Sequence, residues 1–267
     1  MEKQVGILVD TTQCIGCMAC EDACADRWGF PHTDVHELSC EKNTVVQQWG
    51  ETYVPRLCMH CENPACASVC PVGALHKTAD GPVVYDVNKC IGCRYCMQSC
   101  AFQIPKYQWN KPNPKVTKCD MCFDRIERGK QPACVEACPA QARIFGYRDE
   151  LLQEADKRIK QNPQTYIQHI FGKTEVGGTS TVYLAGMDFA KLGFKTDLPK
   201  TELPQYTWNI MSKIPDYVLW GGTLMTGFWW LTNRKKQVAE YEEKLKREKE
   251  DGDDKENKRN TPGGKNE

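Results

Sequence analysis

Apolar residues open two similar segments of the chain, residues 7–17 (ILVDTTQCIGC) and residues 83–93 (VVYDVNKCIGC). Each segment starts with a short apolar run, continues with an aspartate and polar residues, and ends in Cys-Ile-Gly-Cys. Short apolar runs bounded by turn residues are typical of strands. We therefore predict a strand, a turn and a cysteine loop in both places. The self-similarity indicates duplication of one unit.

Beyond residue 147 the apolar pattern becomes helical. The residues that share one face are Leu151, Leu152, Ala155 and Ile159. Their spacing predicts a helix over residues 148–161, with Asp149 as its N-cap and Asn162-Pro163 as its end. Residues 164–214 contain several glycines and prolines. We expect a loop-rich extension there that docks on a partner or, alternatively, covers the rest of the fold.

The next segment, residues 217–233 (YVLWGGTLMTGFWWLTN), holds 17 consecutive uncharged residues with tryptophans near its ends. At the helical rise this length is about 26 Å, the short end of what crosses a bilayer. We therefore predict a single transmembrane helix over residues 215–233, with a buried helix of a globular body as the alternative. In the charged tail, residues 234–267, we expect a solvated helix up to Glu250 and disorder from Asp251.

Positive residues follow the predicted span, at Arg234, Lys235 and Lys236. The positive-inside rule places such residues in the cytoplasm, so the rest of the chain is expected on the periplasmic side of the inner membrane. Residues 1–10 contain neither a long apolar run nor a twin-arginine pair. The sequence therefore predicts export together with a partner that carries the signal.

Cysteine carries the chemistry of this chain. Sixteen of the 17 cysteines fall into four compact groups. The groups are Cys14-x2-Cys17-x2-Cys20-x3-Cys24, Cys58-x2-Cys61-x4-Cys66-x3-Cys70, Cys90-x2-Cys93-x2-Cys96-x3-Cys100 and Cys119-x2-Cys122-x11-Cys134-x3-Cys138. Sixteen thiolates match four [4Fe–4S] clusters with four ligands each. Such clusters carry single electrons, so the sequence predicts an electron relay.

Other function classes fit these features less well. Disulfide frameworks do not repeat C-x2-C-x2-C-x3-C, and a chain of 267 residues does not depend on them for its stability. Zinc sites usually join two separated cysteine pairs, whereas the first and third groups each offer four cysteines within 11 residues. The formal net charge is zero, which does not favour nucleic acid. No nucleophile–base set or phosphate loop indicates catalysis or a small-molecule substrate.

The four groups are expected to combine into two ferredoxin-like modules. Cys58 to Cys100 spans one complete module, which leaves the first and fourth groups as the halves of a second module split by insertion. In ferredoxins with two clusters, the last cysteine of each run binds the other cluster. The predicted iron ligands are Cys14, Cys17, Cys20 and Cys138 (cluster 1), Cys24, Cys119, Cys122 and Cys134 (cluster 2), Cys58, Cys61, Cys66 and Cys100 (cluster 3), and Cys70, Cys90, Cys93 and Cys96 (cluster 4). Pairing the first group with the second, and the third with the fourth, is the competing topology.

The predicted fold class is α+β, with one ferredoxin-like module inserted in the other and a single C-terminal transmembrane helix. The expected parts are the split outer module (residues 1–49 and 111–148), the inserted module (50–110), a helix and loop extension (149–214), the transmembrane helix (215–233) and the charged tail (234–267).

Small and apolar residues inside the cysteine loops have expected roles. Gly16 and Gly92 allow the backbone to fold around a cluster and to direct N–H groups at sulfur. Ile15 and Ile91 are expected to shield clusters from water.

Two residues near the groups are expected not to be ligands. Cys40 lies outside every group and is expected to be a buried free thiol. His60 lies between Cys58 and Cys61, where we expect it to pack or to donate to sulfur. The haem attachment sequence C-x2-C-H is absent, so any haem belongs to a partner.

These motifs resemble the iron–sulfur (beta) subunit of membrane-bound formate dehydrogenases of the N type, within the wider family of iron–sulfur subunits of molybdopterin oxidoreductases. The four cysteine groups, with the x11 gap between Cys122 and Cys134, and the stretch from Phe171 to Leu184 carry the resemblance over about residues 5–235. The sequence is equally similar to the iron–sulfur subunit of membrane-bound periplasmic [NiFe] hydrogenase. The absent export signal favours the formate dehydrogenase type.

The resemblance implies a non-catalytic electron-transfer subunit of an oxidoreductase complex. Its partners would be a catalytic molybdopterin or NiFe subunit and a membrane cytochrome b or quinone-reactive subunit. A relay for a reductase of an oxyanion or sulfur compound, and a soluble polyferredoxin carrier, are the alternatives.

Overall fold

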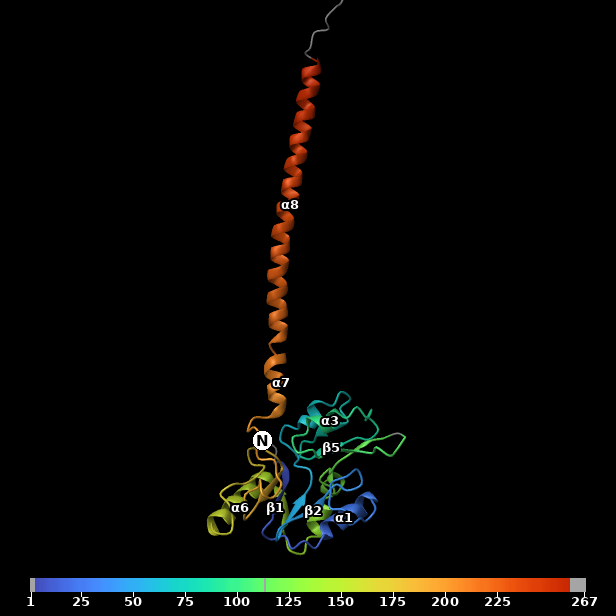
Figure 1. Ribbon diagram of the computed structural model, residues 1–267, viewed down its shortest axis with the longest axis vertical. Coiled ribbons are helices and arrows are strands. Elements are labelled where there is room, and N and C mark those ends of the chain that lie inside the picture. Colours follow the sequence, from blue (N-terminus) through green and yellow to red (C-terminus); the bar gives the residue numbers. More distant parts are fainter. Residues whose placement is uncertain (1–2, 113, 260–267) are drawn as a thin grey trace, which may run out of the picture. The chain divides into compact units, whose positions relative to one another are not determined.

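The computed structural model describes residues 3–112 and 114–259, and the chain divides into two units, Met1–Thr207 and Trp208–Glu267 (Figure 1). The helices are α1 (Ala19–Trp28), α2 (Ala65–Ser68), α3 (Tyr95–Ser99), α4 (Phe123–Ile126), α5 (Ala133–Glu136), α6 (Arg148–Gln161), the 3-10 turn η1 (Glu175–Gly177), α7 (Leu203–Met211) and α8 (Ile214–Arg259). The strands are β1 (Val5–Asp10), β2 (Val45–Trp49), β3 (Thr52–Arg56), β4 (Leu75–Lys77), β5 (Val83–Tyr85), β6 (Lys106–Tyr107), β7 (Val116–Thr117), β8 (Arg143–Tyr147) and β9 (Thr181–Leu184).

A three-stranded sheet in the order β8-β1-β9 lies at the centre of the first unit. Strand β1 pairs antiparallel with β8 and parallel with β9. Because successive side chains of a strand point to opposite faces, Ile7 and Val9 join the main core while Leu8 joins a second cluster beneath α6. All three residues are fully buried. The apolar run that opens the chain is therefore the central strand of the fold.

Both predicted strands before the cysteine loops are confirmed, as β1 and β5. The aspartate that follows the apolar run has the same role in both repeats. Asp10 Oδ1 accepts the backbone N–H of Thr12 at 3.1 Å, and Asp86 Oδ1 accepts that of Asn88 at 2.9 Å. Each aspartate thereby closes a turn two residues on, which leads into the cysteine loop.

The predicted helix over residues 148–161 is confirmed as α6. Its N-cap is Tyr147, and Asp149 lies in the first turn, where a carboxylate favours the positive end of the helix dipole. Leu151, Ala155 and Ile159 are buried against the sheet. The apolar periodicity therefore locates the helix correctly and places its cap two residues late.

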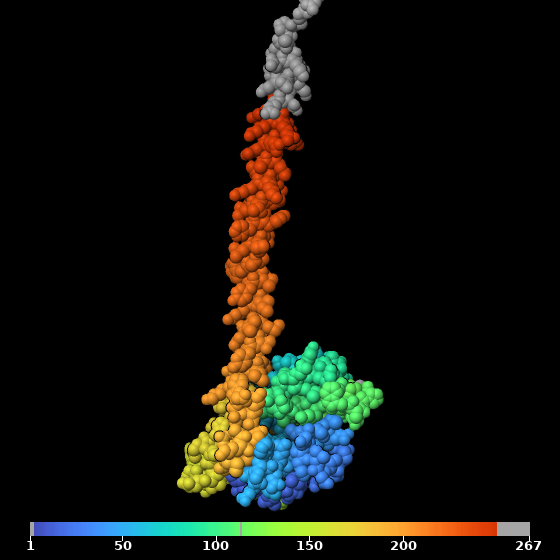
Figure 2. Space-filling model, viewed as in Figure 1, coloured from blue at the N-terminus to red at the C-terminus, as the bar shows by residue number. Residues whose placement is uncertain are grey.

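The two halves of the cysteine-bearing region pack as separate helix pairs. Helix α1 packs against α5, and α2 packs against α3. The competing topology, which joins the first group to the second, would instead place α1 beside α2. Figure 2 shows the inserted segment, cyan to green, as a body beside the blue N-terminal segment. A small buried cluster around Leu75, Val83 and Val116 holds this inserted segment together.

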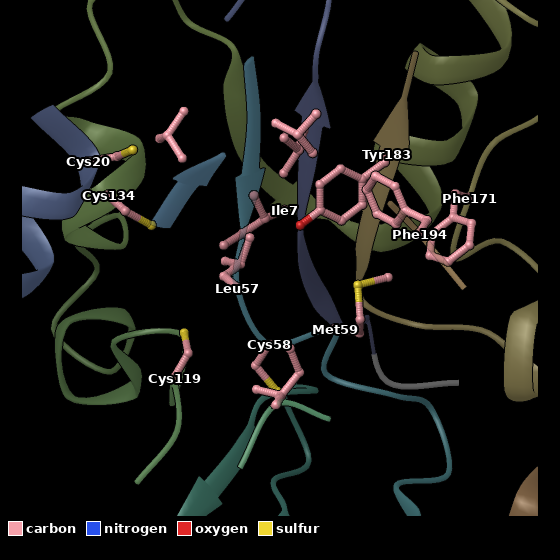
Figure 3. Close-up of a cluster of buried hydrophobic side chains, with 14 of the residues drawn as sticks. Ile7, Cys20, Leu57, Cys58, Met59, Cys119, Cys134, Phe171, Tyr183 and Phe194 are labelled. Atoms are coloured by element: carbon pink, nitrogen blue, oxygen red, sulfur yellow. The ribbon is translucent and has the colours of Figure 1, made fainter. Parts of the chain in front are cut away.

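Residues 166–194 form part of the core, so the expectation of a surface extension is wrong there. Strand β9 is buried along its whole length. Phe171, Tyr183 and Phe194 pack on one another on the side of the core away from Cys20 and Cys134 (Figure 3). Glycines surround the single strand of this segment, which gives its sequence the character of a loop. This burial agrees with the alternative role, covering the rest of the fold, and docking on a partner stays a prediction.

The second unit is dominated by α8, a helix of 46 residues (Figure 1). Among the described helices, none contains a stretch that is both long and apolar enough to cross a bilayer. The prediction of a transmembrane helix over residues 215–233 is therefore wrong. Glycine, threonine, tryptophan and tyrosine interrupt the aliphatic residues of this segment and lower its mean hydropathy, although it is uncharged.

The charged tail is more regular than expected. Helix α8 passes Glu250 and continues to Arg259. Glutamate, lysine and arginine are strong helix formers, and pairs such as Glu243 with Arg247 add support at i,i+4 spacing. Expected disorder from Asp251 is thus not observed up to Arg259. Residues 260–267 lie outside the described part of the chain.

Candidate iron-sulfur centres

The four predicted ligands of cluster 1 line one small cavity. Cys14 and Cys17 lie in the loop after β1, Cys20 lies in the first turn of α1, and Cys138 follows α5. Met18 begins the helix with a φ of 61°. Its left-handed backbone turns the chain from the loop into α1.

The predicted ligands of cluster 4 line a second small cavity. They are Cys70, Cys90, Cys93 and Cys96. Here Arg94 has a φ of 65° and begins α3, as Met18 begins α1. Gly16 and Gly92 have φ angles of 70° and 71°. The duplicated sequence thus builds the same loop twice, each time around a cavity.

Electrostatic interactions show that the other eight predicted ligands also gather in two sets. Burial raises the pKa of the Cys119 thiol, and Asp120, Cys58 of the adjoining set and the set's own thiols of Cys134 and Cys24 raise it further. Burial also raises the pKa of the Cys24 thiol, and the thiols of Cys134 and Cys122 raise it further. These four residues are the predicted ligands of cluster 2.

The predicted ligands of cluster 3 behave in the same way. Burial raises the pKa of Cys61, and the thiols of Cys58, Cys100 and Cys66 add to the shift. Each predicted set therefore has its members within electrostatic reach of one another. The assignment of single cysteines to single clusters stays a prediction.

The four sets follow one another in a fixed order. Figure 3 shows Cys20 near Cys134, and the two thiols interact. Cys119 interacts with Cys58, and Cys66 interacts with Cys96. These electrostatic interactions link sets 1 and 2, sets 2 and 3, and sets 3 and 4. The order along the fold is therefore 1-2-3-4.

The thiols fit a metal cluster better than they fit a metal-free core. Burial raises the pKa of Cys20 to about 11 and that of Cys66 to about 12, because a thiolate is poorly solvated there. Iron binds the thiolate, and its positive charge offsets this cost. A cubane site needs four such sulfurs around a cavity, and that arrangement is present at sets 1 and 4.

Backbone amides also point at the sulfurs. The N–H of Gly92 donates to Cys90 Sγ at 3.4 Å, and that of Met121 donates to Cys119 Sγ at 3.3 Å. The amides of Ile104 and Ala133 donate to the sulfurs of Cys100 and Cys122, at 3.5 Å each. Donors of this kind stabilise thiolate ligands.

Arg143 and His60 are among the buried side chains with a donor atom that has no partner among the described residues. Arg143 borders the cavity of set 1; its Nη2 donates to Thr44 Oγ1 at 3.0 Å, while Nη1 is unpaired. His60 Nδ1 accepts the N–H of Val83 at 2.9 Å, which places the ring proton on the unpaired Nε2. Cluster sulfur is a suitable acceptor for donors of this kind.

The sequence reasoning missed Arg143, although the internal repeat contained a signal. Cys138-Pro139 aligns with Cys70-Pro71, and Arg143 then aligns with Leu75. Leu75 is buried in the apolar core of the inserted module. An arginine at the position of a core leucine indicates a polar or charged environment for that side chain, in place of an apolar one.

Other predicted residues differ in detail from the expectation. Cys40 is only half-buried, and its carbonyl accepts the Thr117 hydroxyl at 2.9 Å. Ile15 and Ile91 border the two cavities but are 63% and 65% exposed. They lie on the outer side of the loops and shield the cavities only in part.

Comparison with known proteins supports the same chemistry. Residues 13–74 and 49–148 each match the 4Fe-4S dicluster domain. The sequence is 37% identical over 246 residues to the hydrogenase-2 operon protein HybA of Escherichia coli O157:H7, covering 74% of each protein.

Two other relatives come from Escherichia coli strain K12. The B subunit of anaerobic dimethyl sulfoxide reductase is 44% identical over 160 residues, which cover 57% of this protein and 77% of the relative. The iron–sulfur subunit of the nitrate-inducible formate dehydrogenase is 36% identical over 205 residues, 68% of each protein. The two matched domains and the 17 cysteines are consistent with four [4Fe–4S] clusters. The protein therefore belongs to the ferredoxin-like 4Fe-4S dicluster family that includes these iron–sulfur subunits.

Proposed function

We propose that this protein is the electron-transfer subunit of an oxidoreductase complex and relays electrons between a catalytic subunit and a membrane partner. The observation that carries the proposal is the order 1-2-3-4 of the cysteine sets. [4Fe–4S] clusters supply the one-electron chemistry, and the polypeptide fixes their sequence and their insulation.

The exposure of the sets supports a relay with two ends. At set 1, Cys17 and the neighbouring Ile15 are exposed, and at set 4 Ile91 is exposed. The sulfurs that join the middle sets, Cys119 and Cys58, are buried. The first and last sets are therefore accessible at the surface, where partners exchange electrons. The sulfurs between the middle sets are shielded from water.

For the catalytic partner we propose a molybdopterin subunit of the formate dehydrogenase type, with a cytochrome b or quinone-reactive subunit on the membrane side. A hydrogenase is the second candidate, because the match to the hydrogenase-2 operon protein covers 74% of this sequence, against 68% for the formate dehydrogenase subunit. Attachment to the inner membrane would come from the partner subunits. A periplasmic location stays a prediction.

The identity of the partner is tested by purification of the complex from its native cells. The tagged protein is purified anaerobically in mild detergent, and molybdenum, tungsten and nickel are measured per polypeptide. We expect about one molybdenum or tungsten atom per polypeptide. Nickel in that amount would identify the hydrogenase alternative. Recovery of the protein alone from the soluble fraction, with none of these metals, would contradict the proposal and support a polyferredoxin carrier.

The metal content of the protein itself is a separate prediction. Four cubanes hold about sixteen iron atoms and sixteen acid-labile sulfides per polypeptide. Anaerobically purified protein is expected to approach these values by elemental and sulfide analysis. Zinc in place of iron, or iron far below this amount after anaerobic reconstitution, would contradict the relay.

A further inference from the structure

Two cations of the first unit are buried without a carboxylate partner. Lys118 is 3% exposed and Arg143 is 2% exposed. Lys118 Nζ donates to the carbonyls of Val83 and Cys119. Arg143 donates to the hydroxyl of Thr44. In the part of the chain that the structure describes, neither forms a salt bridge.

The same fold pairs another buried cation in the ordinary way. Lys42 Nζ lies 2.7 Å from a carboxylate oxygen of Glu21, and both side chains are buried. A buried charge is strongly destabilising unless an opposite charge lies nearby. Lys118 and Arg143 therefore need negative charge from another source.

The main source is the cysteine sulfurs, and each cation lies within electrostatic reach of two sets. Arg143 interacts with Cys20 of set 1 and Cys134 of set 2. Lys118 interacts with Cys58 and Cys66 of set 3 and with Cys119 of set 2, and more weakly with Asp120, whose carboxylate is paired with Arg27. The geometry agrees with this, because Arg143 lines the cavity of set 1, and Lys118 directly precedes Cys119 and donates to its carbonyl. The two cations thus lie at the 1–2 junction and at the 2–3 junction.

We propose that Arg143 and Lys118 are bridging cations that raise the reduction potentials of clusters 1, 2 and 3 and level the electron steps between them. The proposal rests on the relay function proposed above. A [4Fe–4S] cluster with four thiolates is an anion and gains one negative charge on reduction, so a fixed cation beside it stabilises the reduced form.

The shared position explains why the steps become level. In each step the donor cluster is oxidised by one electron and the acceptor is reduced by one. Both clusters border the same cation. The electrostatic attraction that the donor cluster loses on oxidation is therefore matched by the attraction that the acceptor cluster gains on reduction. The cation itself neither gains nor loses a proton or an electron.

The 3–4 junction has no equivalent among the described residues. Leu75 stands where the repeat of the outer module has Arg143. Lys115 donates to the carbonyl of Cys90 at 3.0 Å, but it is partly exposed, so solvent screens its charge. Cluster 4 should therefore not respond to changes at Arg143 or Lys118, which makes it an internal reference.

The test is redox titration of the full-length, iron-loaded protein, followed by electron paramagnetic resonance. Signals are assigned with single-cysteine variants of each set. We expect Arg143→Gln to lower the potentials of clusters 1 and 2, and Lys118→Gln those of clusters 2 and 3. The expected change is about tenfold or more in the reduction equilibrium constant, about 59 mV for one electron. Cluster 4 should keep its potential.

Arg56→Gln is the matched control. This arginine is largely buried, stacks on Phe194, and has no cysteine among its interacting groups. Its variant should leave all four potentials unchanged. Unchanged potentials in both Arg143→Gln and Lys118→Gln, or equal shifts of all four clusters, would overturn the proposal.

A neutral variant that assembles too little iron to titrate is still informative, because charge-retaining variants then decide. Arg143→Lys and Lys118→Arg are expected to restore iron content and potentials if the charge is what matters. Failure of these variants to the same extent as the glutamine variants would assign the residues a packing role and overturn the proposal. Failure of the relay function itself would differ, since the unaltered protein would then lack iron.

Discussion

Replacing Cys138 with alanine is expected to damage the cluster of Cys14, Cys17 and Cys20, and to leave intact the cluster of its own sequence neighbour Cys134. The reason is geometric, because Cys138 borders the cavity of set 1. A cubane that loses one ligand either loses one iron atom or is lost entirely, so iron should fall by between about one and four atoms of about sixteen. Iron analysis and electron paramagnetic resonance measure the loss and show which signal changes.

Cys24→Ala is the reciprocal experiment. Cys24 follows Cys20 in the same group, but its interactions are with Cys122 and Cys134. Its loss should change the signal of cluster 2 and spare that of cluster 1. Cys40→Ala, at a cysteine outside all four sets, should change neither iron content nor signals. If Cys138→Ala removed cluster 2 and Cys24→Ala removed cluster 1, the ligands would not be exchanged between groups.

Much of the cysteine arrangement is predictable because it depends on local spacing. A run such as Cys90 to Cys96 folds around a cavity through its own glycine and its own left-handed residue, so sequence neighbours become spatial neighbours. The predicted exchange of the last cysteine between groups depends on a helix that carries this residue away from its own loop, since Cys24 lies within α1 and Cys138 follows α5. The repeat of residues 7–17 in residues 83–93 adds independent support, and both strands are present.

The missed features depend on contacts that no local pattern records. Strand β9 pairs with β1, where Leu184 lies opposite Asp10 despite the long sequence separation. The position of Arg143 between sets 1 and 2 depends on α5, which packs on α1 and brings Cys134 beside Cys20. At the C-terminus, counting uncharged residues in 217–233 overestimates how apolar the helix is. Spanning a bilayer requires a high mean hydropathy, and a segment without charges does not necessarily have one.

Gly16→Ala is expected to disrupt cluster 1 more strongly than Gly92→Ala disrupts cluster 4. Both glycines have a positive φ, near 70°, so alanine pays the same backbone cost of about 1–2 kcal/mol at either site. The surroundings differ. A Cβ on Gly16 would lie 2.6 Å from the ring of Tyr53, which is held in strand β3. Overpacking of this kind costs a further 1–3 kcal/mol or so.

At Gly92 the added Cβ would lie 3.3 Å from the hydroxyl of Tyr107, at the far end of a side chain that can shift. Gly92→Ala is therefore the matched variant, in which the backbone strain is present and the clash is relieved. The measurement is the intensity of each cluster signal after anaerobic purification and during slow warming. Cluster 1 of Gly16→Ala should be lost at lower temperature than cluster 4 of Gly92→Ala. Equal losses would show that backbone strain alone sets the effect, and Tyr53→Ala in the Gly16→Ala background should restore cluster 1 if the ring is the cause.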